Sequence, residues 1–368
     1  MPELPHFTPI SRQSLHLTYL TAYLYISPIM ELMNYRKLGN SGLMVPEITI
    51  GTWLTLMQAS SIEEARKLIH TALDAGIWLI DTADMYNRGG AEERLGECLK
   101  DIPRSNYLIA TKVFGPMSDH PMDKGLSRRH VMNAVEGSLK RLRTDYIDVY
   151  QCHRYDASTP LEEVCRTFDG LIQQGKIRYW GVSQWSAIQI QKAIHICQLN
   201  HWALPISNQP IYNMLNRSLE IEVMEVCEEA GLGLLVYSPL AQGLLTGKYQ
   251  KGLIPEDSRA GVAETSSNFP FKRMTDENFE KLERLKAIAQ DHKITLPVLA
   301  LAWCLRKTIV SSVIIGASRP EQILQNAQAS GLNLPDTLWN EIEEILQNHP
   351  VDQYTGNRIG HGVSKGGY

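Results

Sequence analysis

The sequence predicts an α/β fold, a single (β/α)₈ barrel of the TIM type. From Ile48 onward, short apolar segments that end in a polar residue or glycine alternate with amphipathic helical patterns. Eight such segments fall within roughly 270 residues, which matches the strand number and size of a TIM barrel. No Pro-, Gly- or Ser-rich linker divides the chain, so we expect one domain over residues 33–350.

The expected strands and helices alternate in chain order. The strand segments are EITIGTW, IWLIDT, YLIATK, YIDVYQCH, IRYWGVS, PISNQP, LGLLVYSPL and SSVIIGAS. The helical patterns between them span residues 61–75, 91–100, 127–142, 161–174, 187–199 and 219–230. Ser127 is placed as the N-cap of the third helix, because apolar residues follow it at helical spacing from Val131 to Leu142.

Two further segments add to the regular alternation. Asn40-Ser41-Gly42 separates two short apolar pieces ahead of the first strand, which predicts an N-terminal hairpin that could plug the bottom of the barrel. A long loop is expected between strands 7 and 8, because residues 241–275 are rich in Gly, Ser, Pro and charge. Two helical patterns, DENFEKLERLKAIAQDH and TLPVLALAWCLRK, follow it. Long loops in compact barrels are usually functional, so this one is a candidate cofactor clasp.

A doubly wound open sheet is the alternative fold. That fold would bind a dinucleotide through a G-x-G-x-x-G turn after the first strand. The first strand and its turn, ITIGTW, carry a single glycine. The barrel is therefore the better interpretation.

Composition narrows the classes of function. Apolar residues make up 43% of the chain and charged residues 21%, as in an ordinary globular protein. The net charge of −4 gives no electrostatic case for nucleic acid, and no basic run favours a membrane surface. The six cysteines are scattered without CxxC or zinc spacing, so we expect reduced packing residues, a cytoplasmic location and no metal site.

The two ends of the chain fall outside the pattern. Residues 15–30 are fairly apolar, but they are too few for a membrane span and have no basic leader region. We expect residues 1–32 to be a disordered extension, or upstream sequence translated in error with Met30 or Met33 as the true start. A regulatory peptide is the alternative. Residues 351–368 are expected to be a C-terminal tail.

The polar residues at the strand ends are candidates for an active site, because the C-terminal strand ends of such a barrel form its active-site face. These residues are Thr52, Trp53, Asp81, Lys112, His153, Ser183, Gln209, Ser238, Gly316 and Ser318, with Tyr86 on the loop after Asp81. Taken singly, each has a structural explanation. The aspartate could cap a turn, the lysine could be a solvated strand end, and the histidine and tyrosine could be hydrogen-bonded or packed residues.

Taken together, four of these residues suggest a reaction. Neighbouring strands would place Lys112 close to Asp81, and a lysine that stays charged favours the ionised form of a nearby phenol. A phenol ordinarily titrates near pH 10, so Tyr86 needs such a neighbour to act as an acid at about neutral pH. His153 on the next strand could orient a carbonyl oxygen. No residue supplies a hydride, so a bound cofactor must do so.

The sequence resembles the aldo-keto reductases. The resemblance rests on RKLGNSGLMV, GTW, DTADMY, ATKV, SLKRLRTDYIDVYQCHR, YWGVS, QPIYN, YSPLAQGLLTGKY and IIGASRPEQILQN, in continuous order over residues 33–350. Within the family it is closest to the branch of the voltage-gated potassium channel β subunits and related bacterial reductases. The resemblance implies a TIM barrel that binds NADP(H), and it suggests homo-oligomers, often tetramers.

The resemblance also assigns site residues by position. The catalytic tetrad falls on Asp81, Tyr86, Lys112 and His153. Nicotinamide contacts fall on Thr52, Trp53, Ser183, Gln209 and Tyr237. The pyrophosphate and adenosine side falls on Ser238, Leu240, Gln242 and Lys248, with Arg259 as a clasp residue. The site for the 2′-phosphate and adenine falls on Gly316, Ser318, Arg319, Gln322, Gln325 and Asn326.

The last of these assignments has its own physical basis. The segment GASRPEQILQN is a loop that runs into a helix, with Pro320 near the first helical position. Free N–H groups and the helix dipole favour a phosphate at such a start, and Lys248 and Arg319 would add charge. This favours NADP over NAD.

Some residues depart from the pattern of the channel β subunits. His153 stands where those subunits often have asparagine and most active reductases have histidine, which favours catalysis. Gln184 and Tyr237 replace an arginine and a tryptophan, so the fine cofactor geometry and the channel docking of that branch are not carried over to this sequence. His120 and Trp185 are further candidates for lining the substrate site.

We therefore expect NADPH-dependent reduction of aldehydes or ketones to alcohols, with hydride from the nicotinamide and Tyr86 as general acid. The expected partner is a small carbonyl compound, without nucleic acid or membrane insertion. An NADPH-binding regulatory subunit of a membrane channel is the alternative, and a barrel with some other chemistry is a third.

Overall fold

The computed structural model of the chain describes residues 33–54, 59–256, 258–266 and 269–348. The expected extension, residues 1–32, and the expected tail, residues 351–368, lie outside the described residues.

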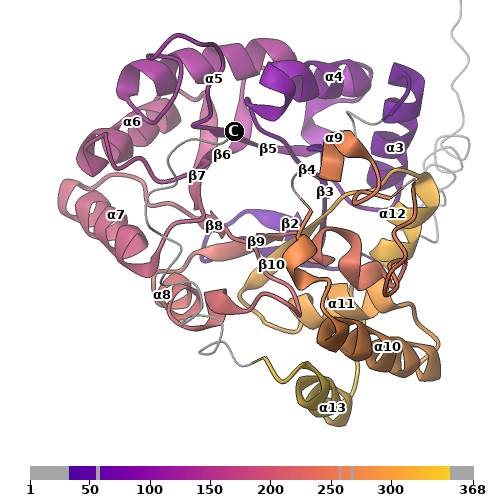
Figure 1. Cartoon of the computed structure of the whole chain (residues 1–368). Helices are drawn as coiled ribbons and strands as arrows, with labels where there is room; N and C mark the ends of the chain where they lie inside the picture. Colours follow the sequence, from indigo (N-terminus) through magenta and orange to yellow (C-terminus); the bar gives the residue numbers. More distant parts are fainter. Residues whose placement is uncertain (1–32, 55–58, 257, 267–268, 349–368) are drawn as a thin grey trace, which may run out of the picture.

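Eight parallel strands form a closed barrel in the order β10-β3-β4-β5-β6-β7-β8-β9 (Figure 1). The strands are β3 (Ile48–Gly51), β4 (Leu79–Asp81), β5 (Leu108–Val113), β6 (Ile147–Cys152), β7 (Ile177–Ser183), β8 (Ser207–Gln209), β9 (Gly233–Tyr237) and β10 (Val310–Ile315). The predicted barrel is confirmed, and the alternative of an open sheet is wrong. The closure of the sheet leaves none of its eight strands with an unpaired edge.

Helices surround the barrel, as Figure 1 shows. They are α3 (Ile62–Asp74), α4 (Gly90–Leu99), α5 (Arg128–Leu142), α6 (Leu161–Gln173), α7 (Ala187–Asn200), α8 (Val223–Glu229), α11 (Leu296–Leu305) and α12 (Pro320–Ala327). Ser127 is the N-cap of α5, and its side chain accepts a hydrogen bond from the His130 N–H. The helix expected over 219–230 is shorter, because a 3₁₀ turn, η4 (Ser218–Glu220), precedes α8.

The barrel interior is apolar at its lower end. Alternate residues of the strands point inward, and Leu79, Ala110, Val149, Leu235 and Ile314 form one buried cluster there. The predicted hairpin, β1 (Tyr35–Lys37) and β2 (Met44–Pro46), contributes to the same cluster. Its side chains Leu38 and Val45 are fully buried. The hairpin therefore closes the bottom of the barrel.

The connection from β9 to β10 is the long one that the sequence predicts. It contains η5 (Ala241–Thr246), α9 (Ala263–Ser266), η6 (Phe271–Arg273) and α10 (Asp276–Asp291) before α11. Its described part reaches the end of the first barrel strand, since the Arg259 guanidinium lies 4.8 Å from the centre of the Trp53 ring. This contact brings the connection to the mouth of the barrel.

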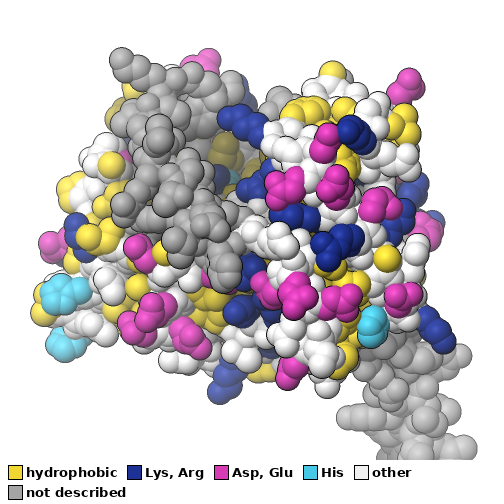
Figure 2. Space-filling model, turned by 60° about the horizontal axis from the view of Figure 1, so that its bottom comes forward, with side chains coloured by type: hydrophobic (Ala, Val, Ile, Leu, Met, Phe, Trp, Pro, Cys, Tyr) yellow, Lys and Arg dark blue, Asp and Glu magenta, His cyan; other side chains and the backbone are white. Residues whose placement is uncertain are grey.

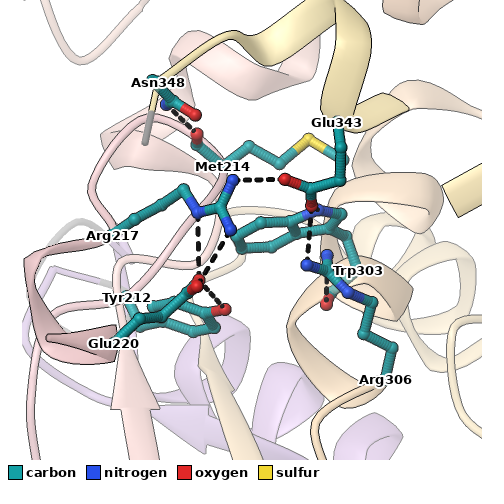
Figure 3. Close-up of polar contacts among 8 residues, drawn as sticks. All are labelled: Tyr212, Met214, Arg217, Glu220, Trp303, Arg306, Glu343 and Asn348. Carbon is teal, nitrogen blue, oxygen red and sulfur yellow. Dashed lines mark hydrogen bonds and ion pairs between the residues drawn. The ribbon is translucent and has the colours of Figure 1, made fainter. Parts of the chain in front are cut away.

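The helix α13 (Asp336–Leu346) has no counterpart among the predicted elements, and a polar network joins it to the loop after β8 (Figure 3). The Glu343 carboxylate accepts hydrogen bonds from Arg217, from Arg306 at 2.7 Å and from the Trp303 indole N–H at 3.1 Å. Arg217 also holds Glu220 through two N–H groups, at 2.9 and 3.0 Å.

The same network supports the loop that follows β8. The Tyr212 hydroxyl donates to Glu220 at 2.6 Å, and the Tyr212 ring stacks on Trp303 at a centroid distance of 5.1 Å. Burial alone would raise the pKa of Glu220, but the hydrogen bonds from Arg217 and Tyr212 and the charge of Arg217 hold it below its usual value. The carboxylate is therefore ionised, and it fixes the loop between β8 and η4.

The described surface carries mixed charge. Figure 2 shows Lys and Arg side chains interspersed with Asp and Glu over the described part of one face. Among the described residues there is no helix of the length and apolar character that crossing a membrane requires.

Replacement of Glu343 by alanine should lower the free energy of unfolding by about 1–3 kcal/mol, because it removes one acceptor from three donors at once. Urea denaturation of the purified protein measures this. Glu344→Ala is the matched control, since Glu344 is the exposed next residue of the same helix. Equal effects of the two substitutions would contradict the importance of the network.

Candidate active site

The upper layer of the barrel interior is polar. In the parallel register, Asp81 of β4 is paired with Gly51 and Ala110, and Lys112 of β5 is paired with Gln151 of β6. Each side chain lies two residues beyond an inward-facing apolar residue of its own strand, so it too points inward. The strand ends therefore bring Asp81 and Lys112 to the same face of the barrel, as the sequence predicted.

Lys112 is the centre of the arrangement. Its side chain is 0% exposed. The ammonium Nζ lies 2.7 Å from Asp81 Oδ2, 2.7 Å from the Thr82 carbonyl oxygen and 3.4 Å from the Tyr86 hydroxyl. A buried ammonium needs such partners, because it has lost its hydration. The close approach of lysine and aspartate, expected from neighbouring strands, is present.

A chain of hydrogen bonds continues from the aspartate. Asp81 Oδ1 accepts from Gln209 Nε2 at 2.8 Å, and the Gln209 carbonyl oxygen accepts from the Ser183 hydroxyl at 2.8 Å. All of these groups are buried. Strands β4, β5, β7 and β8 therefore share one polar network around Lys112.

Tyr86 reaches the mouth through an unusual backbone turn. It begins η2 (Tyr86–Gly89), in which Asn87 and Arg88 have φ values of 50° and 49° and Gly89 has a φ of 94°. Left-handed geometry is costly for residues other than glycine. The turn brings the Tyr86 ring to 6.2 Å from Trp53 and to 5.7 Å, edge to face, from His153.

Burial and charge act in opposite directions on the Tyr86 phenol. Burial raises its pKa, while the Lys112 ammonium lowers it, and the net pKa is above the usual value. Lysine therefore acts in the expected direction, but in the protein alone it does not outweigh desolvation. The Lys112 pKa is itself raised, because Asp81 and Tyr86 more than offset the effect of burial.

His153 is held neutral. Burial lowers its pKa well below the usual value, and the charges of Lys112 and Arg154 lower it further. Its Nδ1 has no hydrogen-bond partner among the described residues. A neutral imidazole can donate one hydrogen bond to a ligand oxygen without adding charge.

The residues predicted for the nicotinamide end surround this centre. The hydroxyl of Thr52 is buried without a partner in the described structure. Ser183 and Gln209 belong to the network above, and the Tyr237 hydroxyl accepts a hydrogen bond from Gln184. Trp53 lies between Tyr86 and the Arg259 guanidinium, whose pKa burial lowers to about 10.

The residues predicted for the phosphate side lie along η5 and α12. Ser238 and Gln242 adopt left-handed φ values of 52° and 59°, Leu240 caps η5, and Lys248 is exposed near the Tyr249 ring. Pro320 is the first residue of α12, as predicted, and Arg319 is its N-cap. The remaining predicted residues of this segment are Gly316, Ser318, Gln322, Gln325 and Asn326, of which Asn326 is buried.

The start of α12 contains an internal contact that the sequence did not predict. Gln322 Oε1 accepts from the Ser318 backbone N–H at 2.8 Å and from its hydroxyl at 3.3 Å. These are two of the donors that the sequence offered to a phosphate. A ligand at this position would have to displace the Gln322 amide or share its donors.

Sequence reasoning missed two buried polar residues, one on a strand of the barrel and one on the loop after β4. Gln151 is fully buried, and neither its amide oxygen nor its nitrogen has a partner among the described residues. Its position two residues before His153 placed it on the same strand face, so the period of two was an available signal. Asp84 is fully buried between β4 and η2, and burial together with the charge of Glu92 raises its pKa well above the usual value.

The fold and this arrangement define a TIM-barrel protein with a buried Lys–Asp pair beside a tyrosine and a histidine. The chain belongs to the aldo/keto reductase family, whose model matches residues 47–347. These proteins are in general NAD(P)-dependent oxidoreductases.

Among curated relatives, the chain is 41% identical over 323 residues to a probable voltage-gated potassium channel subunit beta of Oryza sativa subsp. japonica. It is 41% identical over 325 residues to the corresponding protein of Arabidopsis thaliana. The match covers 86% of this chain and 98% of each relative. A putative subunit beta of Schizosaccharomyces pombe is 40% identical over 328 residues, which cover 86% of this chain and 94% of that relative. The family resemblance inferred from the sequence is thus confirmed.

A double-mutant cycle should show strong coupling between Lys112 and Asp81. Lys112→Met and Asp81→Asn should each lower the free energy of unfolding by about 3–5 kcal/mol, since each leaves one buried group unpaired. The double variant should lose less than the sum of the two, by about 1–3 kcal/mol. The exposed pair Lys251–Asp276 serves as a control and should show no measurable coupling. Additive effects at Lys112 and Asp81 would contradict their pairing.

Proposed function

We propose that the chain reduces aldehydes or ketones to alcohols with NADPH, and that Tyr86 is the general acid. The observation that carries this proposal is the contact of the buried Lys112 ammonium with both Asp81 and the Tyr86 hydroxyl. Family membership supports the reaction class.

The residues at the mouth are compatible with a bound nicotinamide cofactor. The buried hydroxyl of Thr52 has no partner in the described structure, and the Gln209 side chain donates to Asp81 through its amide nitrogen. We propose that these two residues and Ser183 hold the carboxamide, while Trp53 and Tyr237 flank the ring. When bound, the nicotinamide supplies the hydride.

The protein residues handle the proton. Tyr86 would donate its hydroxyl proton to the substrate oxygen, which becomes the alcohol. The phenolate left behind is stabilised by the Lys112 ammonium 3.4 Å away, and Asp81 keeps that ammonium charged. The phenol, whose pKa is raised in the protein alone, therefore has its countercharge already in place.

His153 would orient the carbonyl group. Its ring lies edge to face with Tyr86 at 5.7 Å, so both can point at one oxygen. The low pKa keeps the imidazole neutral. A neutral donor fixes the substrate oxygen without competing with Tyr86 as the acid.

We also propose that NADP(H) is preferred to NAD(H). The support is the charge of Arg319, the N-cap of α12, and of the exposed Lys248 after η5, which would favour a 2′-phosphate. Ser238, Leu240, Gln242 and Arg259 would lie along the rest of the dinucleotide, and Gly316, Ser318, Gln322, Gln325 and Asn326 would surround the adenine end.

Tyr86→Phe should lower turnover by about 10²- to 10⁴-fold, because the acid is lost, while NADPH binding persists. NADPH consumption against a panel of small aldehydes and ketones measures turnover, and nucleotide fluorescence measures binding. Tyr107→Phe is the matched control, since Tyr107 precedes β5 at the opposite end of the barrel. Unchanged turnover in Tyr86→Phe would disprove the assignment, and preferential use of NADH would disprove the cofactor preference.

A regulatory subunit of a membrane channel is the second candidate. The observation in its favour is the 41% identity to proteins named as probable channel β subunits over nearly their whole length. Histidine at position 153 favours catalysis instead, since it gives the mouth a hydrogen-bond donor for a substrate carbonyl.

A pull-down of a potassium channel by the immobilised protein tests this second candidate function. Immobilised protein loaded with NADPH is incubated with a detergent extract of membranes that contain a voltage-gated potassium channel. A regulatory subunit should retain the channel, and Tyr86→Phe should retain it equally, because the surface is unchanged. Absence of the channel from the bound fraction, with turnover of carbonyl compounds present, would reject this role.

A further inference from the structure

Arg154 is an exposed cation at the mouth that the tetrad does not use. It directly follows His153, beyond the C-terminal end of β6. Its Nη1 donates a hydrogen bond to the His153 backbone carbonyl at 2.7 Å. This contact uses one of the five N–H donors of the guanidinium and keeps the group at the rim.

Within the described residues, Arg154 has no ion-pair partner, since no carboxylate oxygen of that part of the chain lies within 4.0 Å of it. Other cations of the barrel are paired: Lys112 with Asp81, Arg104 with Asp148, and Arg141 with Glu92. The charge of Arg154 nevertheless affects the pKa values of three groups at the mouth. Burial raises the pKa values of Tyr86 and Tyr237, and the charge of Arg154 opposes that larger effect. Burial lowers the pKa of His153, and the charge of Arg154 lowers it further.

The position of Arg154 separates it from the proposed phosphate contacts. Those contacts follow β9 and β10, whereas β6 lies four strands from β10 in the closed barrel and therefore opposite it. The cations on the phosphate side are Lys248 and Arg319. Arg154 is thus free to serve a group other than the cofactor phosphates.

Resting on the proposed carbonyl reduction, we propose that Arg154 is a specificity-determining residue that binds a carboxylate on the substrate. The substrate class would be aldehydes and ketones that carry a carboxylate on the same molecule. The carbonyl oxygen would lie between Tyr86 and His153, and the carboxylate would lie at the guanidinium beside them. The planar fork of arginine matches a carboxylate with two parallel hydrogen bonds.

A matched pair of substrates tests this proposal. Succinic semialdehyde carries a carboxylate, and its methyl ester has the same aldehyde without the charge. The wild-type protein should prefer the acid in kcat/KM by about tenfold or more, the effect of a charged hydrogen bond. Arg154→Gln should abolish the preference mainly by raising KM for the acid, and Arg154→Glu should reverse it. Increasing salt should weaken the preference, because the site is exposed.

Arg129→Gln is the control variant. Arg129 is an exposed arginine in the first turn of α5, so the substitution makes the same change in net charge without changing the residue that follows His153. It should leave the ratio of the two kcat/KM values as in the wild type. A wild type without preference, or equal losses for both substrates in Arg154→Gln, would overturn the role of Arg154.

If the protein does not reduce carbonyl compounds at all, the experiment gives a result that differs from the failure of the Arg154 proposal. Neither substrate would then be turned over, and Tyr86→Phe would not differ from the wild type. Titration calorimetry with 4-hydroxybutyrate, the product acid, then decides the question of the anion site. Binding that weakens about tenfold in Arg154→Gln supports the site, whereas equal or absent binding overturns it.

Discussion

The buried Lys112 ammonium constrains most of the mouth. A charge taken out of water is tolerated only beside an opposite charge and hydrogen-bond acceptors. Asp81, the Thr82 carbonyl oxygen and Tyr86 supply these, and Gln209 in turn holds the aspartate. The pairing joins β4, β5 and β8, so a slip of one residue in any of these strands would point a polar group outward and leave another charge unpaired. The strand register of this part of the barrel is therefore fixed by the same contacts that fix the geometry around Lys112.

The rest of the mouth is less completely satisfied. Thr52, Gln151 and His153 each bury a polar atom that finds no partner in the described structure. Such atoms lower the stability of a protein and persist where a bound molecule completes them. The apolar layer below, formed with Leu38 and Val45 of the hairpin, has no such cost. The apolar layer at the bottom of the barrel thus contributes stability, and the polar atoms at the top are available to bind a ligand.

The fold and the centre of the site could be predicted from the sequence, and their surroundings could not. The alternation of strands and helices and the position of Asp81 and Lys112 at strand ends required only a periodicity and the rule that parallel strand ends meet. The net pKa of Tyr86 depends on how deeply the ring is buried, which no spacing reveals. Gln322, expected to bind a ligand, also accepts hydrogen bonds from Ser318, and no spacing reveals that such a local contact competes with a ligand for the same donors. The network of Glu343 joins residues more than 100 positions apart, so no local pattern could indicate it.

The closed lower end of the barrel determines how ligands enter and leave the site. Side chains of the strands fill the lower interior of the barrel and the hairpin covers it, so whatever reacts at Lys112 and Tyr86 must arrive and depart by the opening at the mouth. Two molecules that occupy such a site at different depths cannot pass each other. The deeper one must enter first and leave last, so the packed lower layer of the barrel imposes the order in which molecules enter and leave the mouth.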